Sequence, residues 1–154
     1  MLFLLFQIKD ERYCLEASRV IEVAPLVNFR VIPHTPTCVS GVFSYRGTIV
    51  PVIDLSILLH GEPVRPLLST RIILVDYVGA DKSRHTLGLL AERVTETISC
   101  NEEDFHSPGV EAEDLPSLRD MVLTGGGMVQ RVEIERILPE TLREHLFNAV
   151  EGEE

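Results

Sequence analysis

The sequence predicts an all-β protein made of two packed five-stranded β-barrels that are related by an internal repeat. Short apolar runs bounded by turn residues recur at hairpin spacing along the chain, which is typical of a small barrel. The pattern of the first half restarts in the second half. At 154 residues, the chain is long enough to bury roughly 70% of its extended surface, so that two small barrels can complete each other's cores by packing together.

The first half contains five predicted strands, at residues 2–8, 13–16, 20–23, 42–45 and 49–53. Gly47 is the residue expected at positive φ in a turn between the last two strands, which places Arg46 at their corner. The fifth strand is apolar throughout and is expected to be buried on both faces. Pro51 cannot donate a ladder hydrogen bond, so we expect an edge strand or a bulge there. Asp54 is expected to cap one helical turn at residues 55–59.

The second half repeats this order after a linker at residues 60–66. Residues 15–23 align with 89–97, residues 47–59 with 126–138 and, more weakly, residues 4–8 with 73–77. The alignment predicts that Glu22 superposes on Glu96 and that Val50 superposes on Val129. We therefore expect a single domain over residues 1–150, made of two intertwined lobes with repeat halves at about 2–59 and 71–138.

The remaining segments are connections and ends. Residues 101–116 are acidic and rich in turn residues, so we expect a surface loop there. Pro139 at the first helical position favours a C-terminal helix with Leu142, Leu146 and Phe147 on its apolar stripe. The acidic residues 151–154 are expected to be frayed.

Composition excludes several classes of protein. Three widely spaced cysteines argue against a disulfide framework, and neither they nor the five histidines have metal-ligand spacing. No metal and no cofactor are therefore expected. The net charge of −10 argues against nucleic-acid binding and against an anionic membrane surface. The apolar N-terminal run is eight residues long, too short for membrane insertion or a signal peptide, so a cytoplasmic protein is expected.

Motifs for enzymatic chemistry are missing from the sequence. There is no phosphate-binding loop, no dinucleotide fingerprint and no nucleophile elbow. The glycine run at residues 125–127 precedes a strand and is interpreted as a hairpin turn. A hydrolase on a duplicated β-barrel would use Asp54 and Glu133, but the glycine and hydroxyl residues of such a site do not accompany them. An enzyme is not expected.

The two repeat copies differ at one informative place. Residues 45–47 read Tyr-Arg-Gly, whereas the aligned residues 124–126 read Thr-Gly-Gly, and both copies keep the upstream glutamate. Glu22 therefore has a candidate ion-pair partner in Arg46, while Glu96 has none. The spacing leaves open whether the pair is an ordinary surface ion pair or fixes a binding surface.

Four segments resemble the CheW family of chemotaxis coupling proteins. The segment GVFSYRGTIVPVIDL resembles the family's N-L-R-G and V-V-P-V-I-D-L pattern, with Ser44 and Tyr45 in place of the usual Asn and Leu. RVIEVAPL, LGLLAERVTE and LTGGGMVQRVEIERIL resemble three further family segments, with Glu92 shifted from the family's Asp. The similarity covers about residues 2–138.

This resemblance implies a fold and a role. CheW-like proteins are non-enzymatic scaffolds of two SH3-like barrels that couple chemoreceptors of the methyl-accepting type to the CheA histidine kinase. The receptor's cytoplasmic tip would enter the groove between the barrels, and the barrel ends would contact the kinase regulatory domain, which has the same fold. The protein would be cytoplasmic and recruited to membrane-bound receptor arrays. The alternative is an adaptor of a non-flagellar pathway, or one that binds another CheW-like domain without a receptor.

The resemblance also assigns residues. Those expected to bind a partner are Val20, Glu22, Phe43, Tyr45 and Arg46, and those expected to shape the motif are Gly41, Gly47, Pro51 and Asp54.

Overall fold

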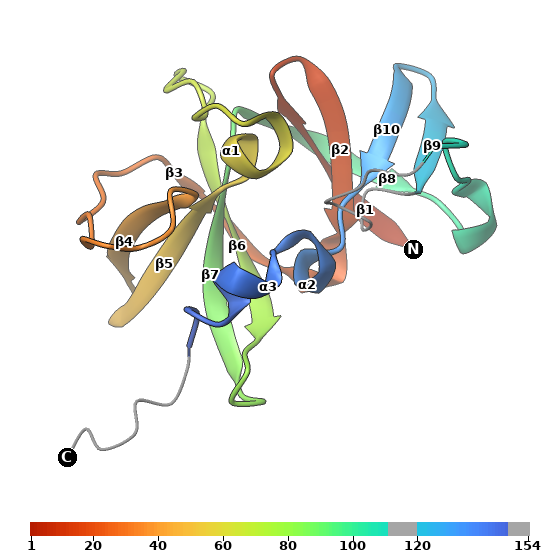
Figure 1. The fold of residues 1–154 in the computed structure, drawn as a ribbon. Helices are drawn as coiled ribbons and strands as arrows, with labels where there is room; N and C mark the ends of the chain where they lie inside the picture. The colour runs from red at the N-terminus through yellow and green to blue at the C-terminus, as the bar shows by residue number, and fades with distance from the viewer. Residues whose placement is uncertain (111–119, 148–154) are drawn as a thin grey trace.

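The computed structural model describes residues 1–110 and 120–147. Within these residues the chain forms ten strands arranged in two five-stranded sheets (Figure 1). The strands are β1 (Leu2–Ile8), β2 (Glu11–Glu16), β3 (Val20–Pro25), β4 (Val39–Tyr45), β5 (Thr48–Asp54), β6 (Arg71–Val78), β7 (Arg84–Ala91), β8 (Arg93–Ser99), β9 (Met121–Thr124) and β10 (Gly127–Arg131). The helices are short: α1 (Leu55–His60), α2 (Ile134–Ile137), α3 (Glu140–Arg143) and the 3₁₀ turns η1 (Ala17–Arg19) and η2 (Glu102–Asp104). The predicted all-β class is confirmed.

The two sheets have the same topology. Sheet A has the strand order β8-β1-β2-β10-β9, and sheet B has the order β3-β6-β7-β5-β4. All neighbours are antiparallel except β2–β10 and β7–β5, which occupy equivalent positions and are parallel. However, the sheets do not coincide with the repeat halves, because β1 and β2 join the last three strands of the second half. Likewise, β6 and β7 join β3, β4 and β5.

Strand registers confirm the predicted equivalence of the two copies. Glu22 pairs with Leu74, and Glu96 pairs with Leu5, which aligns with Leu74 in the repeat. Both pairings shift register next to the glutamate, so β3 and β8 carry the same bulge. In the hairpins, Val50 pairs with Phe43, and Val129 likewise pairs with Val122.

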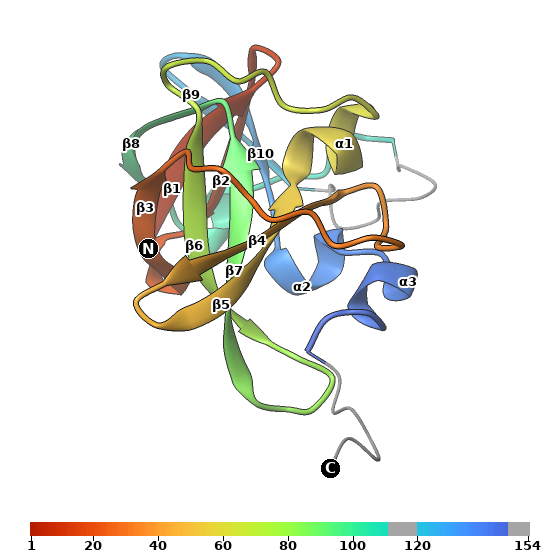
Figure 2. The same ribbon diagram turned by 90° about the vertical axis from the view of Figure 1, so that its left-hand side faces the viewer.

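The buried side chains form three clusters rather than one core. One cluster lies within sheet A and another within sheet B. Together with the half-buried side chains packed against it, each cluster contains residues from both edge strands, as expected when a sheet closes into a barrel. The third and largest is shared between the sheets and includes residues of α1, α2 and α3. These helices gather at the seam on one side of the molecule (Figures 1 and 2). The shared cluster supplies the burial that two small barrels lack separately.

The structure corrects two expectations about the fifth strand. β5 lies between β7 and β4, so the expectation of an edge strand is wrong, and the bulge lies in β4 between Val39 and Gly41. Pro51 is tolerated because it faces Val42, whose backbone bonds to Arg30 instead, and because pairing with β7 begins only at the next residue. Complete burial is also wrong for the first residue of the run, Ile49, which is 72% exposed.

Two further expectations are refined. α3 begins after Pro139, which stands at the N-cap rather than at the first helical position. Leu142 and Leu146 are buried, but α3 ends at Arg143, so Leu146 and Phe147 lie beyond the helix and the predicted helical stripe is wrong for both. Residues 101–110 are mostly exposed, but Phe105 packs against the interior of sheet A. The predictions for residues 111–116 and 151–154 lie outside the described residues.

Candidate functional site

The β4–β5 hairpin presents Arg46 at its tip. Arg46 and Gly47 both have positive φ, of 49° and 80°, which is the combination found in a type I′ turn. Gly47 adopts this conformation without strain, as the sequence predicted. Arg46 is carried beyond the end of the sheet, where 74% of its side chain is exposed.

Glu22 and Arg46 form the predicted ion pair. The Arg46 Nη2 atom lies 3.0 Å from Oε1 of Glu22. The hydroxyl of Tyr45 donates a hydrogen bond to the same oxygen, and the Arg46 guanidinium carbon lies 5.1 Å from the centroid of the Tyr45 ring. The hydrogen bond to Glu22 raises the pKa of Tyr45 above its ordinary value. The sequence indicated the ion pair, but not that Tyr45 would join it.

This three-residue cluster joins the two edges of sheet B. Glu22 lies on β3 and Tyr45 at the end of β4, and these strands are the outermost in the sheet. The ring of Tyr45 also lies 6.4 Å from that of Phe43, which in turn lies 6.1 Å from Phe29. The cluster therefore sits where the barrel closes, with aromatic rings inside and a guanidinium outside.

Not all the predicted partner-binding residues share this environment. Val20 is half-buried and packs against the shared cluster between the sheets. Phe43 is half-buried and packs into the interior of sheet B. Ile21, which no pattern in the sequence marks as a site residue, is 41% exposed at the bulge between Val20 and Glu22. The sequence does not predict this bulge, because a short β-branched run looks the same with or without one.

Gly41 and Asp54 have structural roles. A Cβ atom on Gly41 would lie 2.6 Å from the carbonyl oxygen of Arg30, and its φ is 149°. Asp54 is 3% exposed and accepts hydrogen bonds from the amides of Ser56 (2.9 Å), Ile57 (3.3 Å) and Val64 (3.0 Å).

Burial raises the pKa of the Asp54 carboxyl, and these three amides act in the opposite direction. The carboxylate caps α1 and anchors the linker, so its environment gives no support to the hydrolase interpretation.

The equivalent end of sheet A is built differently. Its β9–β10 turn contains the glycine run, as predicted, and the Arg12 side chain lies against Gly126 and donates to Thr124 Oγ1 at 2.8 Å. Val122 and Thr124 stand in place of Phe43 and Tyr45. Without these rings, a hollow of about 760 Å³ opens between β8 and β9, lined by Ile98, Ser99, Cys100, Asp104, His106, Ser107, Pro108, Met121, Val122, Leu123, Thr124 and Met128.

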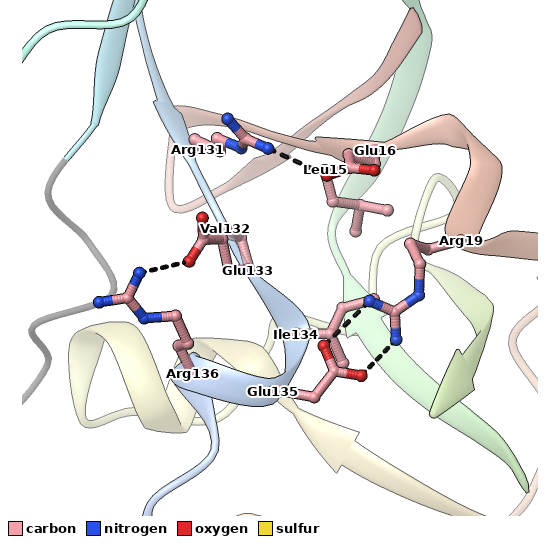
Figure 3. Close-up of a pocket in the computed structure, with 9 residues that line it drawn as sticks. All are labelled: Leu15, Glu16, Arg19, Arg131, Val132, Glu133, Ile134, Glu135 and Arg136. Carbon is pink, nitrogen blue, oxygen red and sulfur yellow. Dashed lines mark hydrogen bonds and ion pairs between the residues drawn. The ribbon is translucent and has the colours of Figure 1, made fainter. Parts of the chain in front are cut away.

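A smaller crevice of about 280 Å³ lies where the chain crosses from β2 through η1 (Figure 3). Arg19 binds Glu135 of α2 through two hydrogen bonds, of 2.9 and 2.5 Å, and donates to the backbone oxygen of Asp76. Burial opposes ionisation of Glu135, but the bonds from Arg19 lower the pKa of its carboxyl. Arg131, 7% exposed, pairs with Glu16 at 3.0 Å. The charges lining this crevice neutralise each other, so we interpret it as structural.

Within residues 1–110 and 120–147, His, Cys, Asp and Glu side chains form no group of three or more that could hold a metal ion. In the same residues, no helix is long and apolar enough to cross a membrane.

The chain is similar to known proteins over nearly its whole length. The family model described as a CheW-like domain matches residues 2–142. The chain is 28% identical over 141 residues to the chemotaxis protein CheW of Rhizobium meliloti (strain 1021), covering 90% of this chain and 88% of that protein. It is 27% identical over 141 residues to the chemotaxis protein CheW of Klebsiella aerogenes, covering 88% and 80%. The crystal structure of the scaffolding protein TtCheW from Thermoanaerobacter tengcongensis matches with a TM-score of 0.79 and 26% identity, covering 92% of this chain and 89% of that one.

Proposed function

Because this chain belongs to the CheW-like domain family, we propose that it is a non-enzymatic scaffold that couples chemoreceptors of the methyl-accepting type to a CheA-like histidine kinase. The observation that carries the proposal is the Arg46 guanidinium, exposed at a hairpin tip and held by Glu22. Only one repeat copy has this arrangement, although the other forms the same hairpin. We place the protein in the cytoplasm, recruited to membrane-bound receptor arrays.

The geometry around Arg46 suits a binding surface. Arginine combines planar donors with an apolar stem, and it is enriched among the residues that dominate binding energy. An ion pair this exposed contributes at most about 1 kcal/mol to folding stability. A change at Arg46 is therefore expected to affect binding much more than folding.

A scaffold must hold two partners at once, so their surfaces should be separable by mutation. We assign the receptor's cytoplasmic tip to the surface containing Arg46, Glu22 and the half-buried Val20. We assign the kinase regulatory domain to the barrel ends. Affinity for the receptor should then depend on Arg46, whereas affinity for the kinase domain should not.

Arg46→Ala tests this assignment. If Arg46 lies at the centre of the receptor contact, its loss is expected to cost about 2 kcal/mol, or roughly thirtyfold in affinity. Calorimetric titrations with a receptor tip fragment and with the kinase regulatory domain would measure both affinities, and thermal unfolding would report the fold. Arg136→Ala is the matched control, because Arg136 is also exposed and also pairs with a glutamate, Glu133, at 2.9 Å.

Unchanged receptor binding in Arg46→Ala would show that the site is wrong. A joint loss of both affinities and of the melting temperature would show that Arg46 is structural. Binding to another CheW-like domain, with no binding to any receptor tip, would instead favour the second role, that of an adaptor without a receptor. The departures at Ser44 and Tyr45 from the usual family residues are the observation that keeps this second role in consideration.

A further inference from the structure

Tyr45 occupies a position where the CheW-like pattern usually has leucine, and its side chain makes contacts that leucine cannot make. Its hydroxyl donates to Oε1 of Glu22, the same oxygen that receives Arg46. Its ring lies beneath the Arg46 guanidinium, 5.1 Å from ring centroid to guanidinium carbon. Glu22, Tyr45 and Arg46 thus form a closed cluster in which each side chain contacts the other two.

This cluster restricts the motion of an otherwise exposed side chain. A free arginine loses rotamer entropy when it is fixed, and the free energy of binding a partner must offset that loss. In this chain, Glu22 holds one end of the guanidinium and the Tyr45 ring supports its face. The Tyr45 hydroxyl also holds Glu22 in place. Part of the ordering is therefore done before a partner arrives.

The second repeat copy shows that the fold does not require such a cluster. Thr124 and Gly125 stand in place of Tyr45 and Arg46, yet sheet A has the same strand order and the same bulge as sheet B. Barrel formation alone therefore does not explain why the ring, the hydroxyl and the guanidinium occur together.

We propose that Tyr45 is a positioning residue that fixes the Arg46 guanidinium so that its remaining N–H donors receive a carboxylate of the partner. This inference rests on the proposed function, because it concerns the same surface. Within the described residues, the hydrogen bond from Arg46 to another side chain uses Nη2 alone. The remaining donors suit the fork-like pairing that guanidinium makes with carboxylate. The chain carries a net charge of −10, so an exposed guanidinium attracts an acidic group that the chain as a whole repels, and a carboxylate placed at Arg46 also fixes the orientation of the partner.

Two substitutions separate the contributions of Tyr45. Tyr45→Phe keeps the ring and removes the hydroxyl, and it is expected to weaken binding to the receptor tip fragment about fivefold. Tyr45→Leu, which introduces the usual family residue, removes ring and hydroxyl and is expected to weaken binding about tenfold. In an Arg46→Ala background, either substitution should change affinity by less than about twofold, because the group that Tyr45 positions is gone.

A measurement on the free protein tests positioning without any partner. The NMR order parameter of the Arg46 Nε–Hε bond should fall in both Tyr45 variants, while the melting temperature of Tyr45→Phe stays close to that of the wild type. The alkaline titration of the Tyr45 phenol is the difference between a protein that has Tyr45 and the same protein with Tyr45→Phe. Because the hydrogen bond to Glu22 raises the pKa of Tyr45, this titration should move to lower pH when both proteins also carry Glu22→Gln. A purely structural tyrosine would not change the order of Arg46.

The outcomes distinguish this inference from the proposed function. No receptor binding by the wild type would overturn the proposed function, and the order parameter would still decide whether Tyr45 positions Arg46. If Arg46→Ala weakens binding but both Tyr45 variants bind like the wild type, the inference alone fails. It also fails if the loss in Tyr45→Phe persists undiminished without Arg46, or if Arg46 is equally ordered in all variants.

Discussion

Replacing Glu92 by glutamine should destabilise the protein in a manner that depends on pH. Glu92 is 2% exposed and lies where the chain passes from β7 to β8. Its carboxylate accepts hydrogen bonds from the amides of Lys9 and Arg65, each at 2.8 Å, and from the Arg65 guanidinium at 2.6 Å. One carboxylate thus holds the β1–β2 turn and the linker against the segment between β7 and β8. Glutamine keeps the size of the side chain but loses its charge.

The lowered pKa of the Glu92 carboxyl gives the size of the stability loss expected for Glu92→Gln. Burial alone would raise the pKa of Glu92, but the bonds from Arg65 and Lys9 lower it from 4.5 to about 2. At 1.36 kcal/mol for each pH unit, this lowering corresponds to about 3 kcal/mol. The Arg65 side chain is 44% exposed, and solvent screening reduces the figure, so we expect a loss of about 2 kcal/mol at pH 7.

The sign follows from the direction of the shift. The folded-state pKa lies below the unfolded value, so the stabilisation is complete above about pH 4.5 and is lost as the pH falls toward 2. Urea unfolding of wild type and Glu92→Gln should therefore differ by about 2 kcal/mol at pH 7 and by about 1 kcal/mol less at pH 3.5. Glu96→Gln, an exposed change in the following strand β8, is the control and should stay within about 0.5 kcal/mol. A cost that is equally small for both variants, or one that does not vary with pH, would refute this reasoning.

Two further comparisons use pairs of equivalent or neighbouring positions. Gly41→Ala should lower the free energy of unfolding by at least about 2 kcal/mol, because its Cβ would meet the Arg30 carbonyl. Gly47→Ala has open space around it and should cost about 1 kcal/mol from backbone strain alone. Equal costs in urea unfolding would contradict the close approach of Gly41 to Arg30. Val122→Phe should add about 1 kcal/mol by filling the hollow in sheet A, and the reverse change in sheet B, Phe43→Val, should cost about 2 kcal/mol. A lower melting temperature for Val122→Phe would show that the hollow cannot take a ring.

Features controlled by nearby residues could be predicted from the sequence. The Arg46–Gly47 turn depends on the backbone freedom of one glycine, and the Asp54 cap depends on a carboxylate one residue before a helical turn. The repeat was visible because two copies of one strand pattern keep their spacing. The Glu22–Arg46 pair could be inferred because the copies differ there.

Features that depend on contacts between distant segments could not be predicted from the sequence. Nothing local shows that β1 and β2 pair with strands from the second half, since both repeats present equally suitable partners. The Tyr45–Glu22 bond exists because the two edges of sheet B meet, and no spacing in the sequence measures the gap between edges. Ile49 is apolar but 72% exposed, whereas Val50 beside it is fully buried, and the β-branched run by itself does not distinguish the two. The sequence by itself thus determined the strands and the turns, because those depend on local periodicity and backbone conformation, and its motifs resembled those of one family. The tertiary structure alone decided which strands share a barrel and which side chains surround Arg46, because those depend on how the closed sheets bring distant residues together.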